Sequence, residues 1–377
     1  MKKVLLVATV QSHICQFHKP LVKMLHDHGC EVHVAARDNL AQKNGLKLDF
    51  VEKVFSVPFE RSPFHPRNLK AYRELKRIID SENYDVIHTN TPVGGIVGRL
   101  ASVKSRKQGC KVLYTAHGFH FFQGGSKKNW IIYYPIERFM SRLTDVLITI
   151  TEEDYLLAKE KFHCKVERIH GIGANSAKYF PVDALQRQLL RQELGLYPNE
   201  KLLLCTGELN ANKNQSTANH AMAQVIRKEP HTKLFHAGNG PAQNSLETLI
   251  GELDLNDHVK LLGYRTDLER FVNAADLVIS CSYREGLPVN IIEAMLCKKA
   301  VVASVNRGHK ELVNPENGFL VRASDADDFA QKILHLLEHE ENSHAMGESG
   351  YKIAQLYTDT AVYVELQSIY SQILGGE

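Results

Sequence analysis

The chain alternates between short, almost continuous apolar runs and longer segments in which apolar residues recur at helical spacing. Runs that predict buried strands lie in the first half at residues 4–10, 31–36, 85–88, 111–116 and 146–149. Between them, segments 18–28 and 68–81 predict helices, and the glycine-rich segment 94–98 predicts a helix packed tightly on a sheet. Alternation of this kind is typical of a parallel sheet, so this half predicts a doubly wound α/β domain.

The same alternation begins again after residue 200. Further apolar runs lie at residues 202–206, 233–237, 259–262, 277–280 and 300–304, and a short strand is expected after Gly318. Between the two sets, the segment 169–175 contains two glycines and suits a hinge, although an ordinary loop explains it equally well. The last segment, 357–374, predicts a helix. The pattern therefore predicts two doubly wound domains that meet near residue 175.

Composition restricts the class of protein without naming its function. Hydrophobic residues make up 44% of the 377 residues and charged residues 24%, which is ordinary for a soluble globular protein. No apolar stretch approaches the roughly 20 residues of a membrane span. The basic start is followed too soon by Gln11-Ser12-His13 for a signal peptide. Seven scattered cysteines, without a Cys-x-x-Cys pair, argue against a disulfide framework or zinc site and favour a reducing, cytoplasmic compartment.

Charge differs between the two halves. Residues 1–175 hold 27 lysine and arginine residues against 17 acidic ones, a balance of +10, and the remainder has a balance of −7. Random scatter over two surfaces would explain this difference. The functional interpretation is that the first half faces something anionic, such as the inner face of a membrane or a phosphorylated acceptor.

The segment from Arg284 to Met295 carries the strongest candidate chemistry. It follows the predicted strand 277–280, turns at Gly286 and Pro288, and continues into a predicted helix. Free backbone N–H groups and the positive end of a helix dipole make such a turn an anion site. Glu285 lies in the turn and Glu293 two helical turns later, so two carboxylates can flank one ligand.

This Glu-x7-Glu pattern, within Glu-Gly-Leu-Pro-x4-Glu-Ala, resembles the nucleotide-sugar signature of retaining glycosyltransferase family four. The resemblance implies the GT-B fold, with two Rossmann-like domains facing across a cleft and a C-terminal helix that crosses back to the first domain. We therefore expect an acceptor-side domain at 1–175 with the helix 357–377, and a nucleotide-sugar-binding domain at 176–356. The family assigns Glu285 to the donor sugar and Glu293 to the ribose hydroxyls. It assigns the diphosphate to the backbone of the turn, at Gly286, Leu287 and Val289.

A second family motif follows the strand at residues 202–206. The family places an arginine and a lysine here to hold the donor diphosphate, and Lys213 matches the lysine. Glu208 stands where the arginine is expected, and Asn210 lies between them. Either Glu208 turns away into a salt bridge, or another cation replaces the arginine, for which Arg307 is the candidate.

Two further turns resemble parts of the family's nucleotide site. Gly238 and Gly240, in Gly-Asn-Gly-Pro after the strand 233–237, would let the backbone approach the base or the diphosphate closely. Tyr264 and Arg265 resemble the loop that contacts the base, and could stack on or edge a uracil.

In the first half, His117 matches a family histidine beside the donor sugar, and His120 is a further candidate. The sequences 88–95 and 115–122 resemble the capsule and exopolysaccharide branch, which typically uses UDP-sugars and an undecaprenyl-diphosphate-linked acceptor. The aromatic and basic segment 119–130 could be a mobile loop that seats such an acceptor at a membrane; a packed loop with a basic edge is at least as good an interpretation.

No metal site or cofactor is expected. Asp325-Ala326-Asp327 has the pattern of a manganese motif from another glycosyltransferase fold, but it is better interpreted as acidic residues opening a helix. The sequence thus predicts a metal-independent hexosyl- or N-acetylhexosaminyltransferase that contacts the membrane peripherally and binds no nucleic acid. A UDP-sugar epimerase of the same fold and a non-catalytic sugar-nucleotide-binding protein remain the alternatives.

Overall fold

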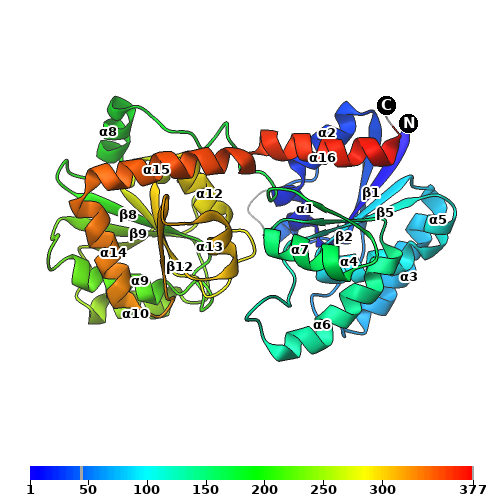
Figure 1. The fold of residues 1–377 in the computed structure, drawn as a ribbon, viewed down its shortest axis with the longest axis horizontal. Helices are drawn as coiled ribbons and strands as arrows, with labels where there is room; N and C mark the ends of the chain where they lie inside the picture. The colour runs from blue at the N-terminus through cyan, green and yellow to red at the C-terminus, as the bar shows by residue number, and fades with distance from the viewer. Residues whose placement is uncertain (43–45, 376–377) are drawn as a thin grey trace. The chain divides into compact units, whose positions relative to one another are not determined.

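The computed structural model describes residues 1–42 and 46–375, which form two compact units (Figure 1). Unit 1 comprises Met1–Gly173 together with the chain from Asp359 onward, and unit 2 comprises Ala174–Thr358. Each unit contains one parallel sheet with helices packed against it, as the alternating pattern predicts.

Unit 1 contains a seven-stranded parallel sheet of order β3-β2-β1-β4-β5-β6-β7. Its strands are β1 (Lys2–Val10), β2 (Cys30–Arg37), β3 (Lys53–Ser56), β4 (Val86–Asn90), β5 (Lys111–Ala116), β6 (Val146–Thr149) and β7 (Lys165–Arg168). Strands β1, β4 and β5 are almost wholly buried, because helices cover both faces of the sheet and every side chain there must be apolar or hydrogen-bonded. The strand order reverses between β1 and β4, which is where such sheets bind ligands.

The helices of unit 1 differ in part from the prediction. They are α1 (Gln11–Phe17), α2 (Lys19–Asp27), α3 (Arg67–Glu82), α4 (Pro92–Ala101), α5 (Val103–Lys107), α6 (Lys127–Met140), α7 (Glu152–Lys161) and α16 (Asp359–Leu374). The glycines of α4 permit the predicted close packing, since a Cβ on Gly98 would lie 2.4 Å from the side chain of Thr89 on β4. Helix α1, which begins directly after β1, was not predicted.

The segment 119–130 has a packed aromatic part and an exposed basic part. Phe119 and Phe121 are 5% and 0% exposed and stack on each other with ring centroids 4.8 Å apart. Trp130 already lies on α6 and packs against Phe121. Phe119, Phe121 and Trp130 therefore pack together in unit 1, which favours the interpretation as a packed segment. Contact of its exposed lysines with a membrane stays a prediction.

The C-terminal helix α16 belongs to unit 1, as the resemblance implied. The hydroxyl of Tyr370, a fully buried side chain, hydrogen-bonds to Nδ1 of His88 over 2.7 Å. Val362 and Leu366 of the same helix are also buried. This helix thus completes the packing over β4.

Unit 2 contains a six-stranded parallel sheet of order β10-β9-β8-β11-β12-β13. Its strands are β8 (Lys201–Thr206), β9 (Thr232–Ala237), β10 (Val259–Leu261), β11 (Leu277–Ser280), β12 (Ala300–Ser304) and β13 (Gly318–Val321). Its helices are α8 (Ala184–Glu193), α9 (Gln215–Val225), α10 (Gln243–Glu252), α11 (Leu268–Ala274), α12 (Val289–Leu296), α13 (Arg307–Leu312), α14 (Ala326–Glu338) and α15 (Glu340–Ala354). The strand order reverses between β8 and β11. All six strands lie where the apolar runs predicted them.

Across residues 1–42 and 46–375, no helix combines the length and the apolar character needed to cross a bilayer.

Candidate active site

Unit 2 brings a lysine and a glutamate together at the carboxyl edge of its sheet. Lys213 lies in the turn after β8 and Glu285 in the turn after β11, and these strands are neighbours where the strand order reverses. Nζ of Lys213 donates to Oε1 of Glu285 over 2.6 Å, and the two side chains are 22% and 14% exposed. The sequence singled out both residues as donor ligands but did not predict that they pair.

Side chains within the turn after β8 fix its shape. Asn210 accepts a hydrogen bond from the backbone N–H of Lys213 over 2.9 Å and donates one from Nδ2 to Glu208 over 3.0 Å. Glu208 is exposed, and its carboxylate bonds within its own turn instead of forming the salt bridge considered for it. Asn212 joins this turn to the one after β11, because its amide donates to the carbonyl of Arg284 over 3.0 Å.

The turn after β11 leads into α12, whose N-cap residue is Pro288. The candidate diphosphate ligands Gly286, Leu287 and Val289 lie at this helix start, where first-turn N–H groups have no partner within the helix. Helix α13 packs closely on the turn, since a Cβ on Gly308 would lie 2.4 Å from the carbonyl oxygen of Gly286. Arg307, the candidate replacement cation, directly precedes Gly308 and opens α13.

Glycines allow the turns after β8, β9 and β10 to pack closely against one another. A Cβ on Gly238 would lie 1.9 Å from the carbonyl oxygen of Gly207, and one on Gly240 would lie 2.2 Å from that of Leu209. The N–H of Gly238 also donates to the carbonyl of Gly263 over 2.8 Å. Contact between the chain's own turns therefore accounts for both glycines. Their predicted approach to a nucleotide stays a prediction.

Glu293 lies on α12 and is held in an unusual electrostatic environment. Burial raises its pKa to about 7, although a hydrogen bond from Tyr179 and the charge of Lys178 act in the opposite direction. Tyr179 is itself buried, and burial together with Glu293 raises the pKa of its hydroxyl. Nothing in the sequence around Tyr179 marks it as a partner of Glu293, which lies more than a hundred residues later.

The two residues predicted to contact the base after β10 differ in their availability to a ligand. The ring of Tyr264 is 56% exposed and can stack on a base. The guanidinium of Arg265 forms a two-pronged ion pair with Asp267, at 2.8 and 2.6 Å, which lowers the pKa of that carboxyl. A nucleotide that contacts Arg265 would share its guanidinium with this carboxylate.

In unit 1, His117 lies at the carboxyl end of β5 among side chains that the sequence did not connect. Its Nε2 atom is 3.3 Å from Oδ1 of Asn90, at the end of β4, and 3.3 Å from Nε2 of His13, in α1. Burial lowers the pKa of His117 well below its usual value, so the ring is neutral at neutral pH. Because β1, β4 and β5 are adjacent in the sheet, polar residues at their ends converge.

A pocket of about 360 Å³ opens beside these residues within unit 1. Its lining includes His13, Thr91, Tyr114 and Tyr133, and aliphatic side chains contribute much of the rest. Thr91 has φ +63° and ψ 153°, a strained conformation for a threonine, and such strain gathers at functional sites. His120 is exposed at the rim, where its ring stacks on Tyr133 with centroids 4.7 Å apart.

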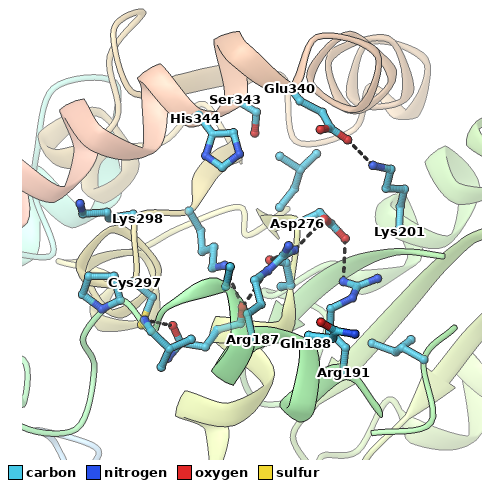
Figure 2. A pocket seen from close by; sticks show the side chains of 18 of the residues that line it. Arg187, Gln188, Arg191, Lys201, Asp276, Cys297, Lys298, Glu340, Ser343 and His344 are labelled. Carbon is cyan, nitrogen blue, oxygen red and sulfur yellow. Dashed lines mark hydrogen bonds and ion pairs between the residues drawn. The ribbon is translucent and has the colours of Figure 1, made fainter. Parts of the chain in front are cut away.

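A larger cavity of about 660 Å³ lies elsewhere in unit 2, at the amino ends of β8, β11 and β12 (Figure 2). Several of its charged groups pair with one another, since Asp276 accepts from Arg187 over 2.7 Å and from Arg191 over 3.1 Å, as Figure 2 shows. In a parallel sheet the amino ends of the strands lie at the edge opposite their carboxyl ends. This cavity is therefore separate from the Lys213–Glu285 site.

Asp325 has the helix-capping role that the sequence predicted. Its side chain accepts from the backbone N–H of Asp328 over 3.0 Å at the start of α14. Asp327 accepts a hydrogen bond from Gln224 on α9. The two carboxylates thus have structural partners.

Comparison with known proteins defines the class. Residues 186–353 match the family model described as "Glycosyl transferases group 1", and residues 20–173 match "Glycosyltransferase Family 4". The chain is 41% identical to "Putative glycosyltransferase EpsD" of Bacillus subtilis (strain 168), over 98% of this chain and 96% of that one. It is 28% identical to an Escherichia coli protein named UDP-Gal:alpha-D-GlcNAc-diphosphoundecaprenol alpha-1,3-galactosyltransferase, over 79% of each chain.

Among solved structures, Anabaena Alr3699/HepE in complex with UDP and glucose superposes with a TM-score of 0.76, at 22% identity over 99% of this chain and 100% of that one. At this identity the likeness shows the fold, which is GT-B. The fold and the two family matches thus define a glycosyltransferase. The chain belongs to glycosyltransferase family four, as the Glu-x7-Glu segment implied.

Proposed function

We propose that this glycosyltransferase moves a hexosyl or N-acetylhexosaminyl group from a UDP-sugar, with retention of configuration, to a saccharide carried on a lipid diphosphate. The product would serve cell-surface polysaccharide synthesis. The observation that carries the proposal is the Lys213–Glu285 ion pair beside the start of α12, at the strand-order reversal of unit 2.

This ion pair suggests how the donor is received. An arriving diphosphate carries negative charge and competes with Glu285 for the ammonium group of Lys213, while the first-turn amides of α12 bind its other oxygens. Glu285 is then released to accept hydrogen bonds from sugar hydroxyls. The bond from the anomeric carbon to the diphosphate oxygen breaks with its electron pair going to UDP. The acceptor hydroxyl attacks the same face, and its proton passes to the departing oxygen.

The pocket of unit 1 supports a saccharide acceptor. The ring of Tyr133 offers an apolar surface, and Thr91 and His13 add polar groups, a mixture suited to a sugar ring. The name of the E. coli relative includes a diphosphoundecaprenol acceptor, which supports a lipid-linked saccharide here. His117 stays the predicted unit 1 residue of the reacting centre.

One assay separates this proposal from its two alternatives. Radiolabelled UDP-sugars are incubated with the protein and a synthetic lipid-diphosphate saccharide, and the lipid and nucleotide fractions are analysed. Sugar in the lipid fraction, α-linked from an α-linked donor by NMR, supports the proposal. Isomerised UDP-sugar indicates an epimerase, and binding without turnover indicates a non-catalytic protein.

Donor affinity should depend on pH through Glu293. Only the carboxylate can accept hydrogen bonds from both ribose hydroxyls, and its pKa of about 7 leaves it mostly protonated at pH 6. We expect the affinity for a UDP-sugar to rise up to about tenfold from pH 6 to pH 8, as expected for one ionisation across its pKa. The measurement is calorimetry with a UDP-sugar, because the terminal phosphate of UDP itself titrates near pH 6.

Glu293→Gln provides the control for this prediction. It should bind more weakly at pH 8 and show no such rise. Because the folded pKa lies above the ordinary value, ionisation of Glu293 destabilises unit 2 as pH rises from about 4.5 to 7. The variant should therefore gain thermal stability relative to wild type at pH 8 but not at pH 4. An equal pH dependence in both proteins would contradict the role of Glu293.

We further propose that transfer needs no divalent metal. Lys213 and the amides of α12 can carry the diphosphate charge, and Asp325 is occupied in capping α14. Activity should be unchanged after exhaustive treatment with EDTA. Loss of activity that Mn²⁺ or Mg²⁺ restores would contradict this expectation.

Peripheral membrane contact is proposed through the exposed face of α6. Lys127, Lys128, Ile131 and Phe139 are exposed on it, Ile131 by 75% and Phe139 by 56%. Basic residues near an anionic surface contribute about 1 kcal/mol each. Arg106 on α5 is not expected to contribute strongly to membrane binding, because Asp145 binds its guanidinium at 2.9–3.1 Å.

Lys127→Ala/Lys128→Ala should weaken co-sedimentation with phosphatidylglycerol vesicles about tenfold or more at low salt, while turnover of a soluble acceptor is kept. High salt should release the wild-type protein, because screening shortens the range of the attraction. Lys260→Ala/Lys352→Ala, which removes the same charge from exposed positions of unit 2, is the matched control and should sediment normally. Wild-type protein that ignores anionic vesicles at low salt would indicate a soluble acceptor.

A further inference from the structure

Three histidines of unit 1 from distant parts of the chain meet at the carboxyl edge of its sheet. His13 lies in α1, His18 separates α1 from α2, and His117 follows β5. One ring nitrogen from each lies within 4.8 Å of the others. The residues Gln11-Ser12-His13, directly after the first strand, thus supply one member of the cluster.

Two of these nitrogens are already as far apart as two ligand atoms on one metal ion. Nε2 of His13 and Nε2 of His117 are 3.3 Å apart. Two nitrogens bound tetrahedrally to Zn²⁺ at about 2.0–2.1 Å are separated by about 3.3–3.4 Å. Closing the whole triangle on the same tetrahedral geometry requires the third nitrogen to move by up to about 2 Å.

The environment of the His18 ring is a second observation that indicates a ligand. Its side chain is 5% exposed, and its Nε2 atom is buried without any hydrogen-bond partner. A buried polar atom without a partner costs about 1–3 kcal/mol, so its retention calls for an explanation. A cavity of about 20 Å³, room for a single small occupant, is lined by His18 and His117, whereas His13 lines the neighbouring unit 1 pocket.

A fourth nearby histidine does not belong to the cluster. His88 bonds from Nδ1 to Tyr370 and from Nε2 to Thr115, each over 2.7 Å, so both of its ring nitrogens are occupied. The ring of His88 packs beside that of His18, with the two ring centroids 6.5 Å apart.

We infer that His13, His18 and His117 bind a transition-metal dication of the Zn²⁺ class through one ring nitrogen each. Three imidazoles with a fourth position open to solvent are a known coordination set for Zn²⁺. His13 and His117 are half-buried and His13 lines the unit 1 pocket, which provides the entry path. Imidazole binds metal through a nitrogen of its neutral form.

The consequence for activity is inhibition. A metal on Nε2 of His117 blocks a side chain that the proposed function places at the reacting centre. It also puts two positive charges at the edge of the unit 1 pocket. Zn²⁺ is therefore expected to act as a reversible inhibitor of an enzyme that needs no metal for transfer. This consequence rests on the proposed function, whereas the metal site itself does not.

Binding is tested on the full chain after removal of metal, with Co²⁺ by absorption spectroscopy and with Zn²⁺ by competition against a chromophoric chelator. Wild-type protein should bind one equivalent and give the intense visible absorption of four-coordinate Co²⁺. His13→Gln and His18→Gln should each lose at least about a hundredfold in affinity, since loss of a partner that only orients a ligand already costs 10–100-fold. His120→Gln, three residues from His117 and outside the cluster, should bind as wild type does.

Substoichiometric binding, or equal affinity in His13→Gln and wild type, would overturn the site. The His13→Gln result stands even if the more buried His18→Gln fails to fold. The inhibition is tested separately as the ratio of transfer rates with and without Zn²⁺, which should approach one in His13→Gln. Stoichiometric binding in a protein that transfers no sugar would support the metal site while contradicting the proposed function.

Discussion

Replacing Glu285 by glutamine is expected to lower the rate constant of transfer, kcat, at least about a hundredfold while UDP still binds. The group removed is a half-buried carboxylate, and interactions of this kind at a reacting centre are worth about 10²–10³ in rate. Its partner Lys213 is released by the change, because the 2.6 Å ion pair no longer competes for the ammonium group. UDP affinity should therefore stay the same or increase.

Steady-state kinetics and calorimetry with UDP test this expectation together. Glu316→Gln is the matched control, because it removes an exposed carboxylate from the same unit and should leave both quantities unchanged. Near-normal turnover in Glu285→Gln would remove Glu285 from the site. Parallel losses of turnover and UDP binding would reassign it to the nucleotide.

Lys213→Met is expected to show the second large effect, with a different signature. It removes the cation proposed for the diphosphate, and the charge on the departing UDP grows during the reaction, so kcat/KM should fall about 10²–10³-fold. UDP binding should weaken as well, because the proposed contact of the lysine with the diphosphate is lost. The substitution also leaves Glu285, a 14% exposed carboxylate, without its ionic partner, which can destabilise the fold. Thermal stability is therefore measured as the control for folding.

The double variant Glu285→Gln/Lys213→Met tests whether the two side chains act as one unit. Residues in direct contact give non-additive effects, so the double variant should lose less than the product of the single losses. Strict additivity would show that the ion pair is incidental to the reaction. Normal UDP affinity in Lys213→Met would assign the diphosphate to Arg307 or to backbone amides alone.

The sequence predicted the fold well because the buried strands of a doubly wound sheet are continuous apolar runs. Strands β5, β6, β11 and β12 have the predicted bounds for this reason. Strand β3 (Lys53–Ser56) was missed because it is an edge strand with mostly exposed residues and so lacks such a run. Helix α6 was missed because the glycines that precede it and the lysines that open it resemble a loop.

The site was predicted one residue at a time, and its contacts were not. Motif spacing identified Glu285 and Lys213, yet 72 positions separate them, and only the order of β8 and β11 makes them neighbours. The histidine cluster was missed altogether, because His13 and His117 are 104 positions apart and a histidine in isolation says nothing. Glu208 had two open interpretations, and its bond to Asn210 depends on local backbone geometry.

Helix α16 has a consequence for how the protein is made. Unit 1 is interrupted by the whole of unit 2, so its last helix leaves the ribosome only after residues 174–358 have been synthesised. At about 5–20 residues per second this takes roughly ten seconds or more. During that time His88 lacks Tyr370, and the apolar surface that receives Val362 and Leu366 is uncovered. Unit 2 can therefore mature before unit 1, and we expect chaperones to bind the nascent chain at this surface.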